Sequence, residues 1–430
     1  MSNAPILGIK NNIGQFTQQL VQVFFVGLMI GMERNIIPAF AEDEFGVAHD
    51  SFLLLTTFVM SFGFVKAAMN FVAGRMSERF GRRQVLLWGW MIALPIPFML
   101  AYAPSWSWVV AANVLLGVNQ GFAWSMTVTA KADIAHAHER GLATGFNEFA
   151  GYGGVAIASI ATGYLVLEHG VRDTLLEFGI AVIFLALMSA YFFTKETLPW
   201  AQAEAKAHNE GSHTGPKPRF PKDVPSTPTS AEIFKLVSYQ NPTFSALSQA
   251  GMVEKFVDAL VWAFYPLYLI SMGLSVVETG WVVGTYGLVW GASQLWTGPL
   301  SDRIGRKGPI VAGMWICGAG VAMTVMGTGI TWWLISATTA GVGMALLYPT
   351  LIAGISDISH PDWRGSSLGV YRFWRDGGYG VGAIMIGLVA QATGQIEYAF
   401  VFTALAMFFS GLYVLVQAEE THPHINPEDA

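Results

Sequence analysis

Hydrophobic positions along the chain gather in twelve long stretches that are separated by short polar connections. Each stretch holds roughly 20 predominantly apolar residues, the length that an α-helix needs to cross a bilayer core about 30 Å thick. The alternation over about ten residues that marks a membrane barrel is not seen in them. The pattern therefore predicts twelve membrane-spanning helices: 16–38, 52–73, 84–103, 106–130, 141–167, 174–194, 244–271, 277–298, 308–328, 331–355, 365–392 and 396–417.

Composition supports the same conclusion. Of the 430 residues, 53% are hydrophobic and 12% are charged, whereas a soluble globular protein carries roughly 25% charged residues. The single cysteine, Cys317, excludes an internal disulfide framework, and a net charge of −6 gives no reason to expect nucleic acid as a partner. We therefore expect an all-α integral membrane protein in contact with the lipid bilayer. It should need no cofactor or metal, and it lacks the nucleophile–base set expected of an enzyme.

Lysine and arginine in the connections predict the orientation. Seventeen of the 23 basic residues lie on one side of the predicted spans, and Arg172 lies alone on the other side. By the positive-inside rule, both termini are expected in the cytoplasm. The chain is thus predicted to be a multi-pass protein of the cytoplasmic (inner or plasma) membrane.

Residues 195–243 interrupt the hydrophobic pattern with a polar, proline-rich stretch that cannot bury a core. This stretch separates six predicted spans from six others, so we expect a linker without chemistry of its own. The predicted organisation is an N-terminal six-helix bundle (1–194), a cytoplasmic linker (195–243), a C-terminal six-helix bundle (244–417) and a cytoplasmic tail (418–430).

The two halves repeat each other. The decapeptide GRMSERFGRR begins at Gly74, and the similar decapeptide GPLSDRIGRK begins at Gly298. The register that aligns these two glycines also pairs Asp133 with Asp357. Other pairs in this register are Arg140 and Arg364, Phe149 and Phe373, and Gly163 and Gly387. Internal repeats of this kind are typical of secondary transporters, whose binding site lies between the repeats.

Both decapeptides resemble the signature of the major facilitator superfamily, Gly-x-x-x-Asp-Arg-x-Gly-Arg-Arg/Lys, and both lie between the second and third spans of their half. Glu78 stands where the family usually has aspartate, whereas Asp302 fits the signature. The resemblance implies two pseudo-symmetric six-helix bundles that rock around a central cavity and transport a small molecule by alternating access. It also implies a cytoplasmic gate made of the motif residues Gly74, Glu78, Arg79, Gly81, Arg82, Gly298, Asp302, Arg303, Gly305 and Arg306.

The residue types of the motif have different physical roles. Glycine permits a tight turn where two helices meet closely. Glu78 and Asp302 are expected to face the positive end of a neighbouring helix, or a basic side chain, across the seam between the halves. The arginines are expected to hold the loop at the anionic inner leaflet, unless they serve only to set the topology.

Small residues and prolines predict how the spans pack. Glycines four residues apart indicate close helix packing. These pairs are Gly27/Gly31, Gly117/Gly121, Gly287/Gly291 and Gly378/Gly382. Predicted kinks lie at Pro38, Pro266 and Pro349.

Ten charged residues lie inside the predicted spans, where each costs at least about 2.5–3.5 kcal/mol at mid-bilayer. They are Glu33, Arg34, Lys66, Glu148, Glu254, Lys255, Asp258, Arg372, Arg375 and Asp376. All fall in spans that the family resemblance places around the central cavity. Lys255 and Asp258 are three residues apart and Arg372 and Asp376 are four apart, so each pair shares a helical face. Lys66, near the cytoplasmic end, is assigned to a structural ion pair or a snorkelling position.

These charges suggest two kinds of chemistry. Arg34, Arg372 and Arg375 offer bidentate bonds to a carboxylate or phosphate, which predicts a substrate with an anionic group. Proton coupling needs a carboxylate that is alternately protonated. The candidates for that carboxylate are Glu33, Asp258 and Asp376. The predicted substrate and proton pathway comprises Glu33, Arg34, Asn113, Glu148, Glu254, Lys255, Asp258, Arg372, Arg375 and Asp376.

The sequence thus predicts a proton-coupled, monomeric secondary transporter of a small organic anion or zwitterion. The alternative within transport is a drug/proton antiporter. Asn113 occupies the position of the arginine typical of that group, and Gly151-Tyr152-Gly153-Gly154 lacks its proline, which argues against this alternative. A receptor or scaffold that moves no solute is a further alternative, and the charges retained inside the membrane argue against it.

Overall fold

The structure is a computed structural model that describes residues 5–45, 52–210, 219–221, 228–274 and 276–426. Within these ranges, the side chains of residues 34–36, 38–43, 52–59, 208, 263, 276 and 277 are not described. The described chain is helical throughout and contains no β-strand.

The first half of the chain contains η1 (Lys10–Asn12), α1 (Ile13–Phe45), α2 (Phe52–Phe80), α3 (Arg82–Ala93), α4 (Ile96–Ala101), α5 (Trp106–Ile134), η2 (Ala137–Glu139), α6 (Arg140–His169) and α7 (Val171–Phe193). The connecting segment contains α8 (Leu198–Asn209), α9 (Ser230–Lys235) and η3 (Leu236–Gln240). The second half contains α10 (Pro242–Ala263), α11 (Tyr265–Ser271), α12 (Val276–Ile304), α13 (Lys307–Met326), α14 (Ile330–Asp357), η4 (Pro361–Trp363), α15 (Arg364–Thr393) and α16 (Glu397–Gln417).

The twelve predicted spans are confirmed, since each coincides with one helix or with two consecutive helices. Two spans are divided at a proline: Pro95 separates α3 from α4, and Pro266 follows the break between α10 and α11. Proline removes a helical hydrogen bond and restricts the residue before it, which explains both breaks. Pro349, by contrast, lies inside the continuous helix α14.

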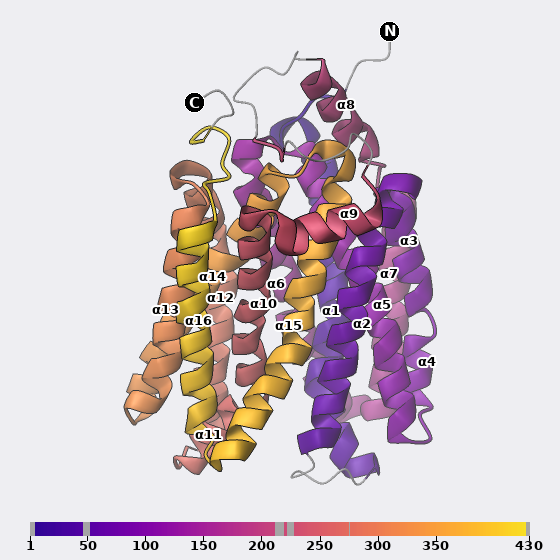
Figure 1. Cartoon of the computed structure of the whole chain (residues 1–430). Coiled ribbons are helices and arrows are strands. Elements are labelled where there is room, and N and C mark those ends of the chain that lie inside the picture. Colours follow the sequence, from indigo (N-terminus) through magenta and orange to yellow (C-terminus); the bar gives the residue numbers. More distant parts are fainter. Residues whose placement is uncertain (1–4, 46–51, 211–218, 222–227, 275, 427–430) are drawn as a thin grey trace.

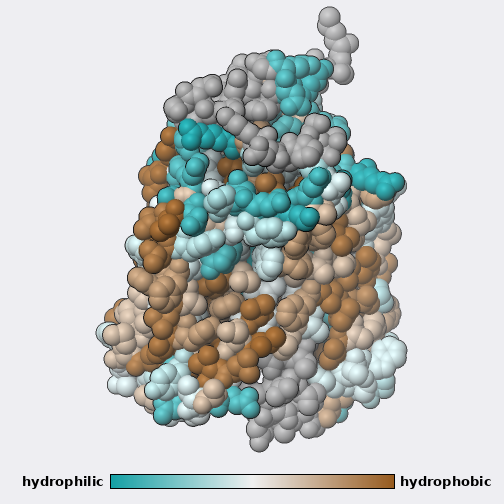
Figure 2. Space-filling view, in the orientation of Figure 1, coloured by the Kyte–Doolittle hydropathy of each residue, from teal (hydrophilic) through white to brown (hydrophobic). Residues whose placement is uncertain are grey.

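Seven helical segments of the described chain are individually long and apolar enough to cross a membrane. α10 and α15, which each carry three of the intramembrane charges, are not among them. On the face drawn in Figure 2, hydrophobic surface covers the middle of the molecule, and hydrophilic surface lies toward both ends. Hydropathy and shape together define a multi-pass membrane protein.

Two helix pairs join the first six spans to the last six. α2 packs along α15, and α6 packs along α12 (Figure 1). Within the halves, α1 lies against α6 and α13 lies against α14. α14 also packs against α6, so the seam between the halves is made mainly of α2, α6, α12, α14 and α15.

The connecting segment is more structured than its composition predicts. α8 and α9 both lie at one end of the bundle, the end at which α16 finishes (Figure 1). The loops at Gly81 and Gly305 lie at the same end, and we call it the basic end because of the arginines these loops carry. A capping box begins α9: the Thr229 hydroxyl accepts from the Glu232 amide (3.3 Å), and the Glu232 carboxylate accepts from the Thr229 amide (2.7 Å).

The glycine pairs divide into two kinds. A Cβ placed on Gly27 or Gly31 would collide with the backbone of α6, so these glycines do permit close packing. Around Gly287 and Gly291, no described atom outside the adjoining turns of α12 lies within 4 Å of the place a Cβ would occupy. The prediction of close packing is wrong for this pair, because α12 faces open space there rather than another helix.

Candidate functional site

The charged residues of α10 and α15 form one network inside the bundle. Lys255 Nζ lies 2.6 Å from Asp258 Oδ2 and 3.7 Å from Glu254 Oε1. Arg375 Nε donates to the same Glu254 oxygen (2.7 Å), and Arg375 Nη1 lies 3.5 Å from Asp376 Oδ1. All five side chains are buried. Predicted pathway residues from two different helices are thus brought into contact.

Asp376 also contacts two polar side chains of α2. Its Oδ2 lies 3.5 Å from Lys66 Nζ and accepts a hydrogen bond from Asn70 Nδ2 (2.7 Å). Lys66 is buried rather than snorkelling to an interface, which agrees with the structural ion pair that the sequence offered as the other assignment. A sequence signal for it existed: Lys66 and Asn70 are four residues apart, which puts two polar groups on one face of α2. The residues of this network are Lys66, Asn70, Glu254, Lys255, Asp258, Arg372, Arg375 and Asp376. We call them the central ion network.

Arg372 differs from every other base in the central ion network. Its side chain is only 1% exposed, and none of its three guanidinium nitrogens has a hydrogen-bond partner among the described residues. The nearest carboxylate oxygen in its ion pairs is Asp376 Oδ2 at 3.9 Å, beyond hydrogen-bond distance. Four bases of the network, Lys66, Lys255, Arg372 and Arg375, face three carboxylates, Glu254, Asp258 and Asp376. The network has a surplus of positive charge and free donors.

Aromatic side chains surround the network. The guanidinium carbon of Arg375 lies 3.5 Å from the ring centroid of Tyr348, and Lys255 Nζ lies 4.7 Å from the same centroid. The hydroxyls of Tyr286 and Tyr379 donate to Asp258 at 3.0 Å and 3.2 Å. These contacts hold Asp258 in place through two donors besides its lysine.

Glu33 lies apart from the central ion network. It is 2% exposed, and within the described chain neither of its carboxylate oxygens has a hydrogen-bond partner. The amide of Asn113, on α5, lies beside it, but Asn113 donates to the Val109 carbonyl in its own helix (3.0 Å). A buried carboxylate without a cation or donor is costly to ionise. The side chain of Arg34, the third predicted anion-binding arginine, lies outside the described residues.

Glu148 occupies a third position. Its Oε1 accepts from the indole of Trp124 (3.0 Å) and from Asn147 Nδ2 (2.7 Å), while its Oε2 has no partner in the described part of the chain. Lys66 Nζ lies 5.3 Å from the centroid of the Trp124 ring. Trp124 therefore contacts both Glu148 and the central ion network.

The acidic residues of the two sequence motifs lie at helix N-termini in the opposite half. The Ser366 amide, at the start of α15, donates to Glu78 Oε1 (2.6 Å). The amides of Gly141 and Leu142, at the start of α6, donate to the two oxygens of Asp302 (2.9 and 2.8 Å). The positive end of a helix dipole favours a carboxylate at this place. Both contacts close the seam at the basic end.

Glycines of the motif make this closure possible. A Cβ on Gly298 would collide with the Gly141 carbonyl oxygen, and one on Gly74 would collide with that of Gly365. Gly81 and Gly305 have φ of +90° and +97°, where a side chain is strained. The remaining motif arginines, Arg79 and Arg303, are exposed.

Buried arginine–aspartate pairs lie behind the motif. Arg82 pairs with Asp133 (2.8 Å) in the first half, and Arg306 pairs with Asp357 (2.9 Å) in the second. Arg140 crosses the seam to reach Asp357 (3.1 Å). Another crossing joins Arg364 to Asp133 at 3.7 Å. The repeat pairs of the sequence therefore build one cross-linked layer.

The connecting segment completes this layer. Glu204, on α8, accepts from Arg140 Nη2 (3.0 Å) with one oxygen and from Arg364 Nη2 (2.8 Å) with the other. Because these arginines begin α6 and α15, one carboxylate ties both halves together. The polar composition of the linker does not predict this contact, since hydropathy says nothing about which surface a polar segment covers.

Two further glutamates of the basic end were not predicted from the sequence. Glu196 accepts from the amides of Arg82 (2.8 Å) and Arg83 (3.1 Å), and Glu420 accepts from those of Arg306 (2.7 Å) and Lys307 (3.1 Å). Each carboxylate caps the helix that follows a motif, α3 or α13. The sequence holds a signal for them, because the repeat register also pairs Glu196 with Glu420 and both are followed by a threonine.

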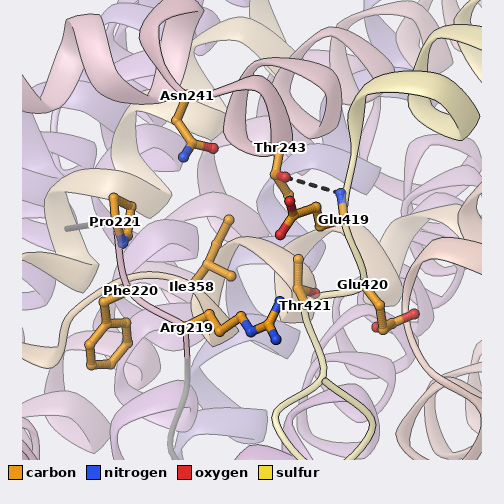
Figure 3. Close-up of a pocket in the computed structure, with 9 residues that line it drawn as sticks. All are labelled: Arg219, Phe220, Pro221, Asn241, Thr243, Ile358, Glu419, Glu420 and Thr421. Carbon is orange, nitrogen blue, oxygen red and sulfur yellow. Dashed lines mark hydrogen bonds between the residues drawn. The ribbon is translucent and has the colours of Figure 1, made fainter. Parts of the chain in front are cut away.

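A cavity of about 380 Å³ lies at the basic end, where the connecting segment meets the C-terminal tail (Figure 3). Its lining includes Arg219, Asn241 and Glu420, and the Thr243 hydroxyl accepts from the Glu419 amide (3.1 Å) beside it. None of the intramembrane charges whose side chains are described lines it. This cavity therefore belongs to the linker–tail contact and not to the central ion network.

His422, in the tail next to Thr421, is expected to make the stability of the protein depend on pH. It is 1% exposed, and burial, together with the nearby Arg306, lowers the pKa of His422 to about 4 from an ordinary 6.5. Because the histidine has a lower pKa in the folded chain, the unfolded chain binds a proton at a pH at which the folded chain does not. Proton binding then favours the unfolded chain. Relative to a His422→Gln variant, the wild type should lose stability as the pH falls from about 6.5 to about 4.

The melting temperature of both purified proteins, measured across this pH range, checks the prediction. Acids elsewhere in the chain act equally on both proteins, so the difference isolates the histidine. A difference between the two proteins that stays constant with pH would contradict the assignment.

A closed seam between two repeated halves, an ion network inside the bundle and twelve spans are features of transporters built from internal repeats. The family model of the Major Facilitator Superfamily matches residues 20–253 and 247–430. The chain belongs to the Major Facilitator Superfamily.

Individual relatives are distant. An uncharacterised MFS-type transporter of Salmonella typhimurium is 22% identical over 400 residues, covering 90% of this chain and 92% of the relative. The proton-coupled antiporter flippase LtaA of Staphylococcus saprophyticus is 22% identical over 84% of each chain. Among solved structures, the human organic anion transporter MFSD10 is similar in fold, with a TM-score of 0.74, 15% identity, and coverage of 94% of this chain and 99% of that one.

Proposed function

We propose that this protein is a proton-coupled secondary transporter of a small organic anion in the cytoplasmic membrane. The observation that carries the proposal is Arg372, which is buried with a complete guanidinium fork that no described residue bonds. A buried charge without partners costs free energy unless something binds to it, and this fork matches the geometry of a carboxylate or phosphate. The surplus of bases over carboxylates in the central ion network supports an anion rather than a cationic drug as substrate.

The proposed transport cycle is alternating access between the two halves, with both termini in the cytoplasm. The distribution of basic residues supports placing the basic end there. With the contacts of Glu78, Asp302 and Glu204 made, the structure is closed at that end. Opening toward the cytoplasm then requires these contacts to break while a new seam closes at the opposite end.

Glu33 is our proposed proton carrier. Asp258 and Asp376 are each engaged by a lysine and by further donors. Glu33 has no ion-pair partner among the described side chains, and neither of its oxygens bonds the Asn113 amide beside it, so burial favours its uncharged form. It would release the proton when the seam moves and water or a base reaches it.

The variant Glu33→Gln is expected to separate exchange from proton coupling. A neutral amide mimics the protonated acid, so counterflow of substrate should persist at a rate within several-fold of the wild type. Accumulation driven by a pH gradient should be lost. A variant that still accumulates substrate in response to the gradient would exclude Glu33 as the carrier, and Glu44→Gln, at an exposed position of the same helix, is the matched control.

Proton flux in proteoliposomes tests the proposed function directly. The probes are succinate, phenylphosphonate and benzenesulfonate, because anions that stay charged do not cross lipid as neutral acids. Adding an accepted probe should move protons across the membrane of vesicles that contain the protein, and protein-free liposomes give the background. If none of these anions moves protons or raises the melting temperature of the purified protein, the proposal fails.

A further inference from the structure

A cavity of about 400 Å³ opens between α6, α10 and α12, next to the central ion network. Four glycines line it: Gly153 on α6, and Gly284, Gly287 and Gly291 on one face of α12. We call this cavity the glycine groove. Its volume falls in the range of small-molecule binding sites.

The glycines of the groove are not there for packing. A Cβ on any of the four would meet no described atom outside the adjoining turns of its own helix within 4 Å. Farther along the same two helices, the added Cβ of Gly141 would collide with the carbonyl oxygen of Gly298. Glycine in a helix costs roughly 0.5–1 kcal/mol relative to alanine. Because close packing does not require these glycines, their effect is to keep the groove open.

Polar atoms in and beside the groove have no partners among the described residues. Trp290 lines the groove and is 5% exposed, and its indole nitrogen makes no hydrogen bond to them. One turn farther on the same face of α12, Gln294 is fully buried, and both atoms of its amide are likewise unpaired within the described chain. Buried donors and acceptors are normally satisfied, so these groups are suited to a ligand with acceptor atoms.

Flat aromatic surfaces form the walls. The rings of Tyr152 and Trp290 lie 4.3 Å apart between centroids, and Trp290 is 5.7 Å from Tyr348. Lys255 Nζ lies 5.2 Å from the Trp290 ring centroid, and Arg375 stacks on another member of this aromatic group, Tyr348. The groove is therefore mostly apolar and aromatic, and it meets the central ion network at Asp258, which lines it and whose partner Lys255 lies 2.6 Å away.

We propose that the glycine groove binds the flat apolar body of the transported anion, which makes the substrate class an aromatic organic anion. This inference rests on the proposed function and adds the substrate's shape. The ring lies on Tyr152 and Trp290 over the glycine face of α12, and the acidic group points to the central ion network. Side chains in place of the glycines would occupy the space of the ring.

The probes are 2-naphthalenesulfonate and methanesulfonate, which share the anionic group and differ in the apolar body. Binding is measured by the melting temperature of the purified full-length protein over a range of probe concentrations. The wild type should bind 2-naphthalenesulfonate at least 10-fold more tightly than methanesulfonate. Gly287→Leu should weaken 2-naphthalenesulfonate at least 10-fold and leave methanesulfonate within twofold of the wild type.

Gly280→Leu is the matched control, because Gly280 lies on the same helix, faces open space and does not line the groove. It should bind both probes as the wild type does. Trp290→Phe provides a second variant should Gly287→Leu fold poorly, and the loss of its indole N–H should weaken 2-naphthalenesulfonate several-fold.

The outcomes separate this inference from the proposed function. If methanesulfonate and 2-naphthalenesulfonate bind equally well, or if Gly287→Leu and Trp290→Phe leave both affinities unchanged, the groove is not the site and an anion transporter remains. If neither probe binds and succinate and phenylphosphonate also fail to act, the proposed function itself is overturned.

Discussion

Replacing Arg372 by glutamine should abolish anion-dependent proton flux and weaken anion binding by about 100-fold or more, which is about 2.7 kcal/mol. Charge-assisted hydrogen bonds contribute about 1.5–3 kcal/mol each, and a bidentate guanidinium supplies two of them. The same variant should melt at or above the temperature of the wild type without probe. The reason is that all three guanidinium nitrogens are buried without partners in the described chain, so removing the charge removes a cost of folding.

Two further variants make the result specific. Arg372→Lys keeps the charge but loses the planar fork, and it should recover only part of the affinity. Arg172→Gln removes an arginine at the opposite end of the bundle, where its partner Glu44 is solvent-exposed, and it should bind and transport as the wild type does. The assignment is wrong if Arg372→Gln transports normally, or if it melts well below the wild type.

The second large effect is expected at the basic end. Asp357 is fully buried and pairs with Arg306 and Arg140, which belong to different halves. Breaking a buried ion pair by removing one partner costs about 3–5 kcal/mol. Each arginine keeps a second carboxylate, Asp302 or Glu204, so Asp357→Asn should cost about 3 kcal/mol, the lower end of that range. The cost falls on the conformation closed at the basic end.

A single reporter cysteine measures this opening. Thr144 on α6 is buried, and its hydroxyl donates across the seam to the Pro349 carbonyl (3.0 Å). With Cys317 replaced by alanine, Thr144→Cys should resist N-ethylmaleimide in an otherwise wild-type background and react at least 10-fold faster with Asp357→Asn. Asp362→Asn, in the same loop at a half-exposed position, is the matched control and should change nothing. Equal protection in both variants would mean that the buried pair does not hold the seam.

Much of the fold follows from local properties of the chain. Hydropathy locates the twelve spans because lipid requires a continuous run of apolar side chains for each helix. The pairing of Lys255 with Asp258 also follows from the sequence, since residues three apart on a helix share a face. The breaks near Pro95 and Pro266 have equally local causes.

Other features depend on neighbours that are distant in sequence. The sequence assigns Lys66 to a structural or interfacial position, because nothing near it in the chain reveals that Asp376 lies across the seam. The spacing of Gly287 and Gly291 predicts a packing contact, although α12 faces a cavity there. In each case the sequence shows correctly which residues share a helix face. It does not show which residue or cavity that face meets.

Among the gate residues, the repeat carries more information than the motif alone. The register that aligns Gly74 with Gly298 pairs Asp133 with Asp357 without reference to their arginines, and it also pairs Glu196 with Glu420. Such a register shows that two positions are equivalent, but it does not show what either of them contacts. Glu204 illustrates the limit, since its bonds to arginines of both halves depend on where the linker helix α8 lies in space.

The sequence by itself determined that this protein lies in a membrane, how many spans it has, the predicted side of its basic loops and its membership of a transporter family. All of these depend on local hydropathy, charge and a repeated motif. Only the tertiary structure decided which charges meet and which remain free. Arg372 and Arg375 are three residues apart on one helix, yet the guanidinium of the first has no hydrogen-bond partner in the described chain while the second is held by Glu254 and Asp376. The energy of a buried charge depends on groups within a few ångströms in space, and those groups come from helices that are far apart along the chain.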